Sequence, residues 1–262
     1  MIRRLIGVVA TLASSGCTQV ATDANAVVAL WFEGSAYPSV VVGDSLRDSL
    51  GAVQPLIATA LNYRNEPVPD APMEFLSRDT VLQVFEDGVV YARARRPDTV
   101  ATVFATTGTL QSQPDSLFVV LRADSIAADS ATMTRPTGGL LVPDSIAFKV
   151  FVPGVDGAPA TAARHWLVSF QLQLHDQLLD PTDTTAAYTF TGDFRDLRRI
   201  RRSFIDTTSS AGVVSRGLLV HCEALATGPD SVIVIATLRD RRPGTEPKRA
   251  QTVVRLERGQ CQ

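Results

Sequence analysis

Residues 166–174 read Trp-Leu-Val-Ser-Phe-Gln-Leu-Gln-Leu, and they carry the clearest structural pattern in the chain. From position 168 onward, large apolar side chains alternate with polar ones, the apolar set being Val168, Phe170, Leu172 and Leu174. Successive side chains of a β-strand point to opposite faces, so this alternation predicts a strand with one buried face and one face toward water. Such strands are typical of antiparallel sheets that pack on one side only.

Short runs rich in Val, Leu, Phe and Thr, separated by turn residues, extend the pattern in both directions. They cover 27–32, 39–42, 56–61, 73–76, 81–85, 89–94, 100–106, 117–121, 144–152, 212–224, 231–238 and 250–256. Regular spacing of short strands predicts an all-β protein made of antiparallel sandwiches. We expect one domain over residues 27–122 and a second over 123–262, with an insertion at about 175–204.

The first half resembles a known family. Residues 55–72 read Pro-Leu-Ile-Ala-Thr-Ala-Leu-Asn-Tyr-Arg-Asn-Glu-Pro-Val-Pro-Asp-Ala-Pro and look like the second strand and following turn of a bacterial immunoglobulin-like (Big) domain. Residues 77–79 and 87–92 are similar to the next landmarks of that family, and the strand 99–105 follows them. The resemblance implies two immunoglobulin-like sandwiches. Both Trp31 and Trp166 fit buried strand positions in such a fold.

The N-terminus is typical of a lipoprotein signal peptide. Arg3 and Arg4 precede an apolar run, residues 5–13, that is too short to span a bilayer stably, and Ser-Ser-Gly-Cys follows at 14–17. We expect residues 1–16 to be removed, Cys17 to be lipidated, and residues 17–26 to form a tether. The alternative is an ordinary secretory signal cut near residues 13–15, which leaves Cys17 unmodified. Resemblance to Gram-negative lipoproteins implies that Thr18, in place of Asp, directs the protein to the outer membrane.

The chain contains three cysteines. If Cys17 carries lipid, Cys222 and Cys261 remain as a pair in an oxidising compartment, and we expect a disulfide between them. The alternative is a loose C-terminal tail with Cys222 as a small buried side chain.

Composition and motifs exclude several classes of function. A net charge of −2 recruits neither nucleic acid nor an anionic surface. The three histidines are scattered, at 165, 175 and 221, with no Cys-x-x-Cys or His-x-x-x-His pattern beside them, so we expect no metal site. Gly-x-Ser-x-Gly, His-Glu-x-x-His and phosphate-loop motifs are absent from the sequence, so we expect no enzymatic activity and no cofactor.

Asp-Ser pairs directly precede several apolar strand starts, at Asp115-Ser116, Asp124-Ser125, Asp144-Ser145 and Asp230-Ser231, and they recur in looser surroundings at Asp44-Ser45 and Asp48-Ser49. Their side chains can accept hydrogen bonds from nearby backbone amides and close turns. Calcium binding is the alternative, but the pairs lack the dense oxygen spacing of a calcium loop.

Five arginines gather within the expected insertion: Arg195, Arg198, Arg199, Arg201 and Arg202. They are our candidate surface for an acidic partner such as an envelope protein or glycan. The alternative is a solvated segment whose arginines pair with aspartates 180, 183, 193 and 196.

The sequence therefore favours a non-enzymatic cell-envelope lipoprotein, held to a membrane by its lipid, that serves as an adhesion, scaffold or spacer module. The competing hypothesis is an accessory or degenerate hydrolase module with its site in residues 175–204. Exposed paired carboxylates in a cleft there would favour the hydrolase.

Overall fold

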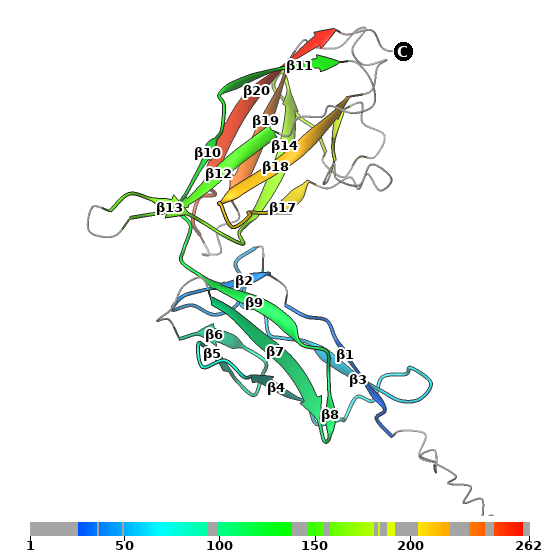
Figure 1. Ribbon diagram of the computed structural model, residues 1–262. Helices are drawn as coiled ribbons and strands as arrows, with labels where there is room; N and C mark the ends of the chain where they lie inside the picture. Colours follow the sequence, from blue (N-terminus) through cyan, green and yellow to red (C-terminus); the bar gives the residue numbers. More distant parts are fainter. Residues whose placement is uncertain are drawn as a thin grey trace, which may run out of the picture.

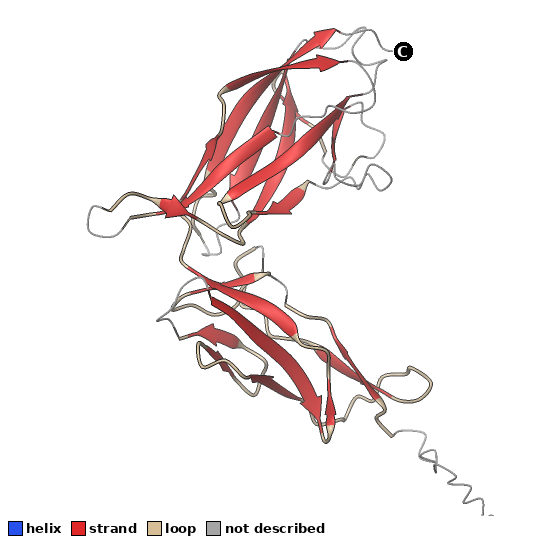
Figure 2. Ribbon diagram, viewed as in Figure 1, coloured by secondary structure: helices blue, strands red, loops and turns tan. Residues whose placement is uncertain are grey.

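The computed structural model describes residues 26–35, 37–48, 50–93, 99–137, 146–154, 158–180, 183, 188–191, 204–220, 231–238 and 244–258. Every regular element in these ranges is a β-strand, and the strands form two sandwiches arranged end to end (Figures 1 and 2). The all-β, two-sandwich fold predicted from the alternation of side chains is confirmed.

The first sandwich comprises nine strands in the residues that the structure describes. They are β1 (Ala29–Phe32), β2 (Ser39–Val41), β3 (Ala58–Leu61), β4 (Glu74–Ser77), β5 (Leu82–Val84), β6 (Val90–Ala92), β7 (Thr99–Thr107), β8 (Leu110–Gln111) and β9 (Asp115–Val120). One sheet has the order β2-β9-β7-β4 with β8 beside β7, while β1 pairs with β3 and β5 pairs with β6.

The second sandwich contains the remaining strands. They are β10 (Ser125–Ala128), β11 (Thr132–Thr137), β12 (Ile146–Val152), β13 (Thr161–Ala162), β14 (Leu167–Leu174), β15 (Gln177–Leu178), β16 (Tyr188–Thr191), β17 (Ile205–Thr207), β18 (Val213–Val220), β19 (Ser231–Leu238) and β20 (Arg249–Arg258). One sheet has the order β10-β12-β18-β16 and the other β11-β20-β19-β14-β15, with β13 beside β12 and β17 beside β14.

Both sandwiches begin in the same way. The first segment pairs antiparallel with one sheet, as β1 does with β3 and β10 with β12. The chain then crosses to the other sheet and pairs parallel with its last strand, as β2 does with β9 and β11 with β20. The other strand pairs within the described residues are antiparallel. β2 and β11 each run in the same direction as the last strand of their own sandwich.

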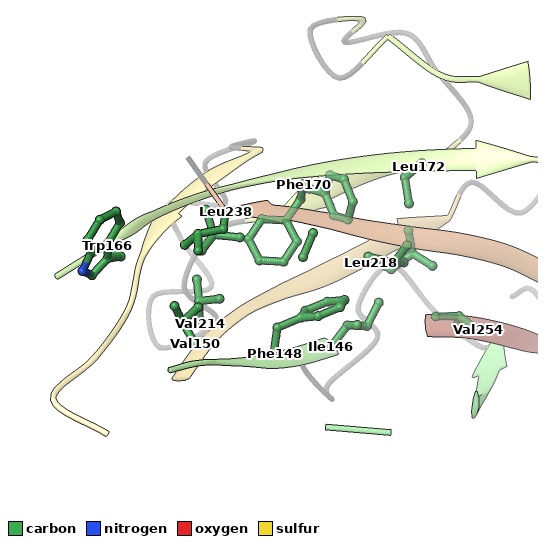
Figure 3. Close-up of a cluster of buried hydrophobic side chains, with 14 of the residues drawn as sticks. Ile146, Phe148, Val150, Trp166, Phe170, Leu172, Val214, Leu218, Leu238 and Val254 are labelled. Carbon is green, nitrogen blue, oxygen red and sulfur yellow. The ribbon is translucent and has the colours of Figure 1, made fainter. Parts of the chain in front are cut away.

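The predicted alternation at 168–174 builds the larger core. Val168, Phe170 and Leu172 are buried, and the Phe170 ring meets the Phe148 ring edge-on at 5.8 Å between centroids. Figure 3 shows these rings between the two sheets, with Trp166 at one end of the cluster. The buried position expected for Trp166 is confirmed, since its exposed fraction is 0%.

Trp31 does not occupy the buried position expected for it. Its side chain is 62% exposed. Trp31 lies opposite Thr59 in the β1–β3 register, whereas the neighbouring Phe32 packs against the core. The alternation of a strand therefore places Trp31 on the outer face.

Aspartates close turns as predicted from the Asp-Ser pairs. The Asp44 carboxylate accepts a hydrogen bond from the backbone N–H of Ser45 at 2.8 Å. The carboxylate of Asp115 accepts from the N–H of Ser116 at 2.8 Å and from the N–H and hydroxyl of Ser35 at 2.8 and 2.9 Å. These side chains thus fix loops, including one that is distant in sequence.

Part of the expected insertion belongs to the second sandwich. β15 pairs with β14, and β16 pairs with β18. Phe190 is 4% exposed and its ring lies 5.7 Å from that of Phe170. Residues 177–178 and 188–191 are therefore structural strands, which corrects the prediction of an insertion running through the whole of 175–204.

The directions of β18 and β20 bear on the expected disulfide. β12 is antiparallel to both β10 and β18, and β11, which continues β10, is parallel to β20. β18 and β20 therefore point toward the same end of the domain (Figure 1). Cys222 and Cys261 follow these strands and lie outside the described residues.

We predict that Cys222 and Cys261 are bonded to each other. Closing the loop of roughly 40 residues between these cysteines should stabilise the second domain by about 4 kcal/mol in the chain-entropy model. Thiol labelling of the denatured, unreduced protein should find neither cysteine reactive, and a reduced sample serves as the control. Two reactive cysteines beyond position 17 would refute the bridge.

Candidate functional site

The site residues predicted from sequence lie outside the described part of the chain. This applies to Cys17, to Cys222 and Cys261, and to the arginine cluster Arg195, Arg198, Arg199, Arg201 and Arg202. Lipidation, the disulfide and the binding of an acidic partner stay predictions. The described residues instead bring together a set of contacts at the junction of the two sandwiches.

A short linker joins the sandwiches, and hydrogen bonds cross the junction beside it. β9 ends at Val120 and β10 begins at Ser125. The backbone N–H of Leu167 donates to the Tyr37 hydroxyl at 2.7 Å, and the Ser39 hydroxyl donates to the carbonyl of His165 at 2.7 Å. Tyr37 and Ser39 are fully buried, at 1% and 0% exposure. Both bonds are thus partly shielded from water, and a hydrogen bond is stronger in such a low-dielectric environment than in water.

Apolar contacts reinforce these bonds. The Phe118 ring stacks on the His165 ring with 3.3 Å between centroids and 6° between planes. Val41 and Val120 of the first sandwich belong to the core cluster of the second, and Leu167 packs against the core of the first. The two cores therefore meet at the junction.

Thr208 fixes the loop of the second sandwich that contains the junction residue His165. Its hydroxyl donates to the carbonyl of Ala163 at 2.8 Å and accepts from the N–H of Trp166 at 3.0 Å. Its backbone N–H donates to the Trp166 carbonyl at 2.9 Å, and its carbonyl accepts from the His165 N–H at 3.1 Å. Thr208 is 1% exposed, so all four bonds are sheltered. His165 keeps a left-handed φ of 56° within this loop.

Asp44 links the linker to the first sandwich. Its carboxylate pairs with Arg122 of the linker at 2.9 Å and with Arg47 at 3.1 Å. Burial alone raises the pKa of Asp44, but the hydrogen bonds from Arg122, the Ser45 N–H and Arg47 outweigh burial and hold that pKa below its ordinary value. The charged form of Asp44 is therefore stabilised by folding.

A small hollow borders β16. It has a volume of about 230 Å³ and is lined in part by Leu172, Asp180, Asp183 and Tyr188. Burial raises the pKa of the Tyr188 hydroxyl, which keeps this side chain neutral. Asp180 and Asp183 belong to one turn, since the N–H of Asp183 donates to the Asp180 carbonyl at 3.2 Å.

The described ranges hold no cluster of three His, Cys, Asp or Glu side chains that could bind a metal ion. In the same ranges, no helix has the length and apolarity that crossing a membrane requires.

Sequence reasoning missed the junction entirely. Tyr37 and Ser39, Phe118, and His165 come from three separate segments, and their partners lie up to 130 positions away. A single sequence carries no mark of such long-range pairs. The nearest local sign is the position of His165 immediately before the alternating stretch.

We predict that Asp44→Asn lowers the free energy of unfolding by about 1.5 kcal/mol at pH 7, because it removes a charged acceptor from two arginines. The folded-state pKa is depressed, so this contribution is present above the ordinary value of 3.8 and disappears as the pH falls through the lowered folded-state pKa. Urea denaturation of both proteins at pH 7 and near pH 2.5 should show the difference shrinking. Asp70→Asn, at an exposed carboxylate, is the control. A difference independent of pH would contradict the ion-pair explanation.

No protein-family model and no curated protein matches this chain. Among solved structures, the Yersinia pseudotuberculosis adhesin InvE is similar over 86% of this chain and 58% of its own, with 11% identity and a TM-score of 0.33. Domains 4 and 5 of the S-layer protein SbsC match over 87% and 96%, with 15% identity and a TM-score of 0.30. Drosophila N-cadherin EC1-4 matches over 87% and 50%, with 13% identity and a TM-score of 0.27. This chain thus spans less than two thirds of InvE and of the cadherin fragment.

Proposed function

We propose that this protein is a non-enzymatic lipoprotein of the bacterial cell envelope, anchored through Cys17, whose two immunoglobulin-like sandwiches act as a stiff scaffold or spacer. The observation that carries the proposal is the junction. The two sandwiches are joined by a linker restricted to residues 121–124, by the hydrogen bonds of Tyr37 with Leu167 and of Ser39 with His165, and by the stacked Phe118 and His165 rings. Interdomain contacts that are buried and specific oppose free hinge motion.

Export and anchoring rest on the sequence. Arg3 and Arg4, the short apolar run and Gly16-Cys17 together supply what a signal peptidase and a lipidating enzyme require. Two or three acyl chains hold a protein at a membrane far longer than one does, because each buried methylene contributes about 0.8 kcal/mol. Outer-membrane location is part of the proposal, on the basis of Thr18.

The arginine cluster, Arg195, Arg198, Arg199, Arg201 and Arg202, is the proposed contact for an acidic envelope protein or glycan.

The hydrolase alternative has one observation in its favour, because Asp180 and Asp183 are exposed carboxylates beside a hollow. They come from a single turn, however, and the strand that borders them packs Tyr188 and Phe190 into the core. The scaffold proposal therefore accounts for more of the described structure.

We predict that the Arg122–Ala123 bond resists trypsin in the native protein, because Arg122 is paired with Asp44 and lies at the packed junction. Phe118→Ala removes the stacked pair, which is worth about 0.5–1.5 kcal/mol, and should raise the rate of cleavage there roughly 2- to 12-fold. Mass spectrometry of timed digests identifies the cleaved bond. Phe85→Ala, at a 42% exposed phenylalanine of the same sandwich, is the matched control. Rapid cleavage after Arg122 in the unaltered protein would show that the junction is loose and would overturn the stiff-scaffold proposal.

We also predict that the mature N-terminus is a lipid-modified Cys17. Mass spectrometry of the protein extracted from membranes should find the N-terminal peptide heavier by the mass of its acyl chains. Cys17→Ser should abolish both the modification and recovery in the membrane fraction. An unmodified terminus at another residue would rule out the anchor.

A further inference from the structure

Apolar side chains lie exposed on one face of the first sandwich, next to the point where the N-terminal tether joins it. Trp31 is 62% exposed, Tyr63 50% and Ile57 43%. Trp31 lies on β1, Ile57 precedes β3 and Tyr63 follows it. We call these three residues the tether-side patch.

Strand register places Trp31 and Ile57 on the outside of the β1–β3 pair, and Tyr63 lies exposed in the turn that follows β3. Leu56 and Ala60 point into the sandwich, with exposures of 3% each, so alternation turns Ile57 and Thr59 outward. Trp31 is paired with Thr59, whose neighbours along that face are Ile57 and Leu61. Within the described residues, β1 and β3 form a sheet of two strands.

The same corner of the domain receives the tether. The backbone N–H of Val28 donates to the Leu61 carbonyl at 2.9 Å, which ties the start of β1 to the end of β3. Tyr63 follows two positions later, and the Arg64 guanidinium lies 5.2 Å from the centroid of its ring. An exposed tryptophan, and a tyrosine backed by an arginine, are side chains that favour the boundary between lipid and water.

The length of the tether limits how far the patch can move from an anchored Cys17. Residues 18–25 separate Cys17 from Ala26, the first described residue. A segment of this length reaches at most about 30 Å. Short tethers produce effective concentrations in the millimolar range, so a weak apolar contact is enough to be populated.

We propose that the tether-side patch docks on the surface of the bilayer that holds the lipid anchor. Trp31 and Tyr63 enter the interfacial layer and orient the first sandwich with the outer face of β1 and β3 toward the membrane. The partner is a neutral or zwitterionic lipid surface, because the exposed charges beside the patch, Glu33, Arg64 and Glu66, are mixed in sign. The inference rests on the proposed anchor, and the test below supplies an anchor chemically so that the two can fail separately.

The two tryptophans make a direct test available. Trp31 is exposed and Trp166 is completely buried, so quenching of the exposed component of the fluorescence reports on Trp31. A chain beginning at Cys17 is joined through its N-terminal cysteine to a lipid thioester, a ligation specific to that terminus, and is incorporated into phosphatidylcholine vesicles. Part of the lipid carries bromine on the acyl chains close to the headgroup.

Docking predicts that brominated lipid quenches the Trp31 emission, that its maximum shifts to the blue, and that added salt leaves both effects unchanged. Trp31→Phe should leave only the unquenched emission of Trp166. The matched control is Leu76→Trp in the Trp31→Phe background. This places a reporter at a 42% exposed position on β4 in the other sheet, and it should stay unquenched.

Two results would overturn the proposal. If Trp31 stays insensitive to brominated lipid and open to an aqueous quencher such as acrylamide, the patch does not touch the bilayer. If Trp31 is shielded from both quenchers in a way that depends on protein density, a second copy of the chain covers the patch. Absence of natural lipid on Cys17 would refute the anchor without altering either readout.

Discussion

Each sheet of a sandwich has two faces, and a strand can bury only alternate side chains against the partner sheet. This constraint governs the whole molecule. Along β14 it places Val168, Phe170 and Leu172 in the core and Ser169 and Gln171 on the other side. The same rule turns Phe32 inward and Trp31 outward on β1. The register of a strand therefore decides which side chains stabilise the core and which are exposed on the surface.

The fold followed from the sequence because alternation is local. The pattern at 168–174 and the regular spacing of apolar runs predicted strands that the structure contains, and the Asp-Ser pairs predicted turns of the kind that Asp44 and Asp115 close. Trp31 was misplaced because size and hydrophobicity favour burial on average, whereas the register of β1 against β3 is a long-range property. The strands at 177–178 and 188–191 were misassigned because they are short and adjoin a polar, arginine-rich segment.

The candidate site was less accessible to sequence reasoning. The contacts of Tyr37 with Leu167 and of Ser39 with His165 exist only because the two sandwiches meet. Thr208 is a small polar residue after a short strand, and nothing in its neighbourhood distinguishes it from other threonines. Its importance lies in four hydrogen bonds to one loop. Long-range geometry of this kind leaves no trace in composition or periodicity.

The parallel pairing of β2 with β9 has a mechanical consequence for an anchored protein. Tension that enters from the N-terminal side reaches the start of β2, and tension toward the second sandwich leaves from the end of β9. Because these strands run in the same direction, such forces slide one along the other and strain all the hydrogen bonds between them together. β11 and β20 repeat the arrangement in the second sandwich. Each sandwich would then resist stretching by shear between its first and last strands, in place of opening one bond at a time.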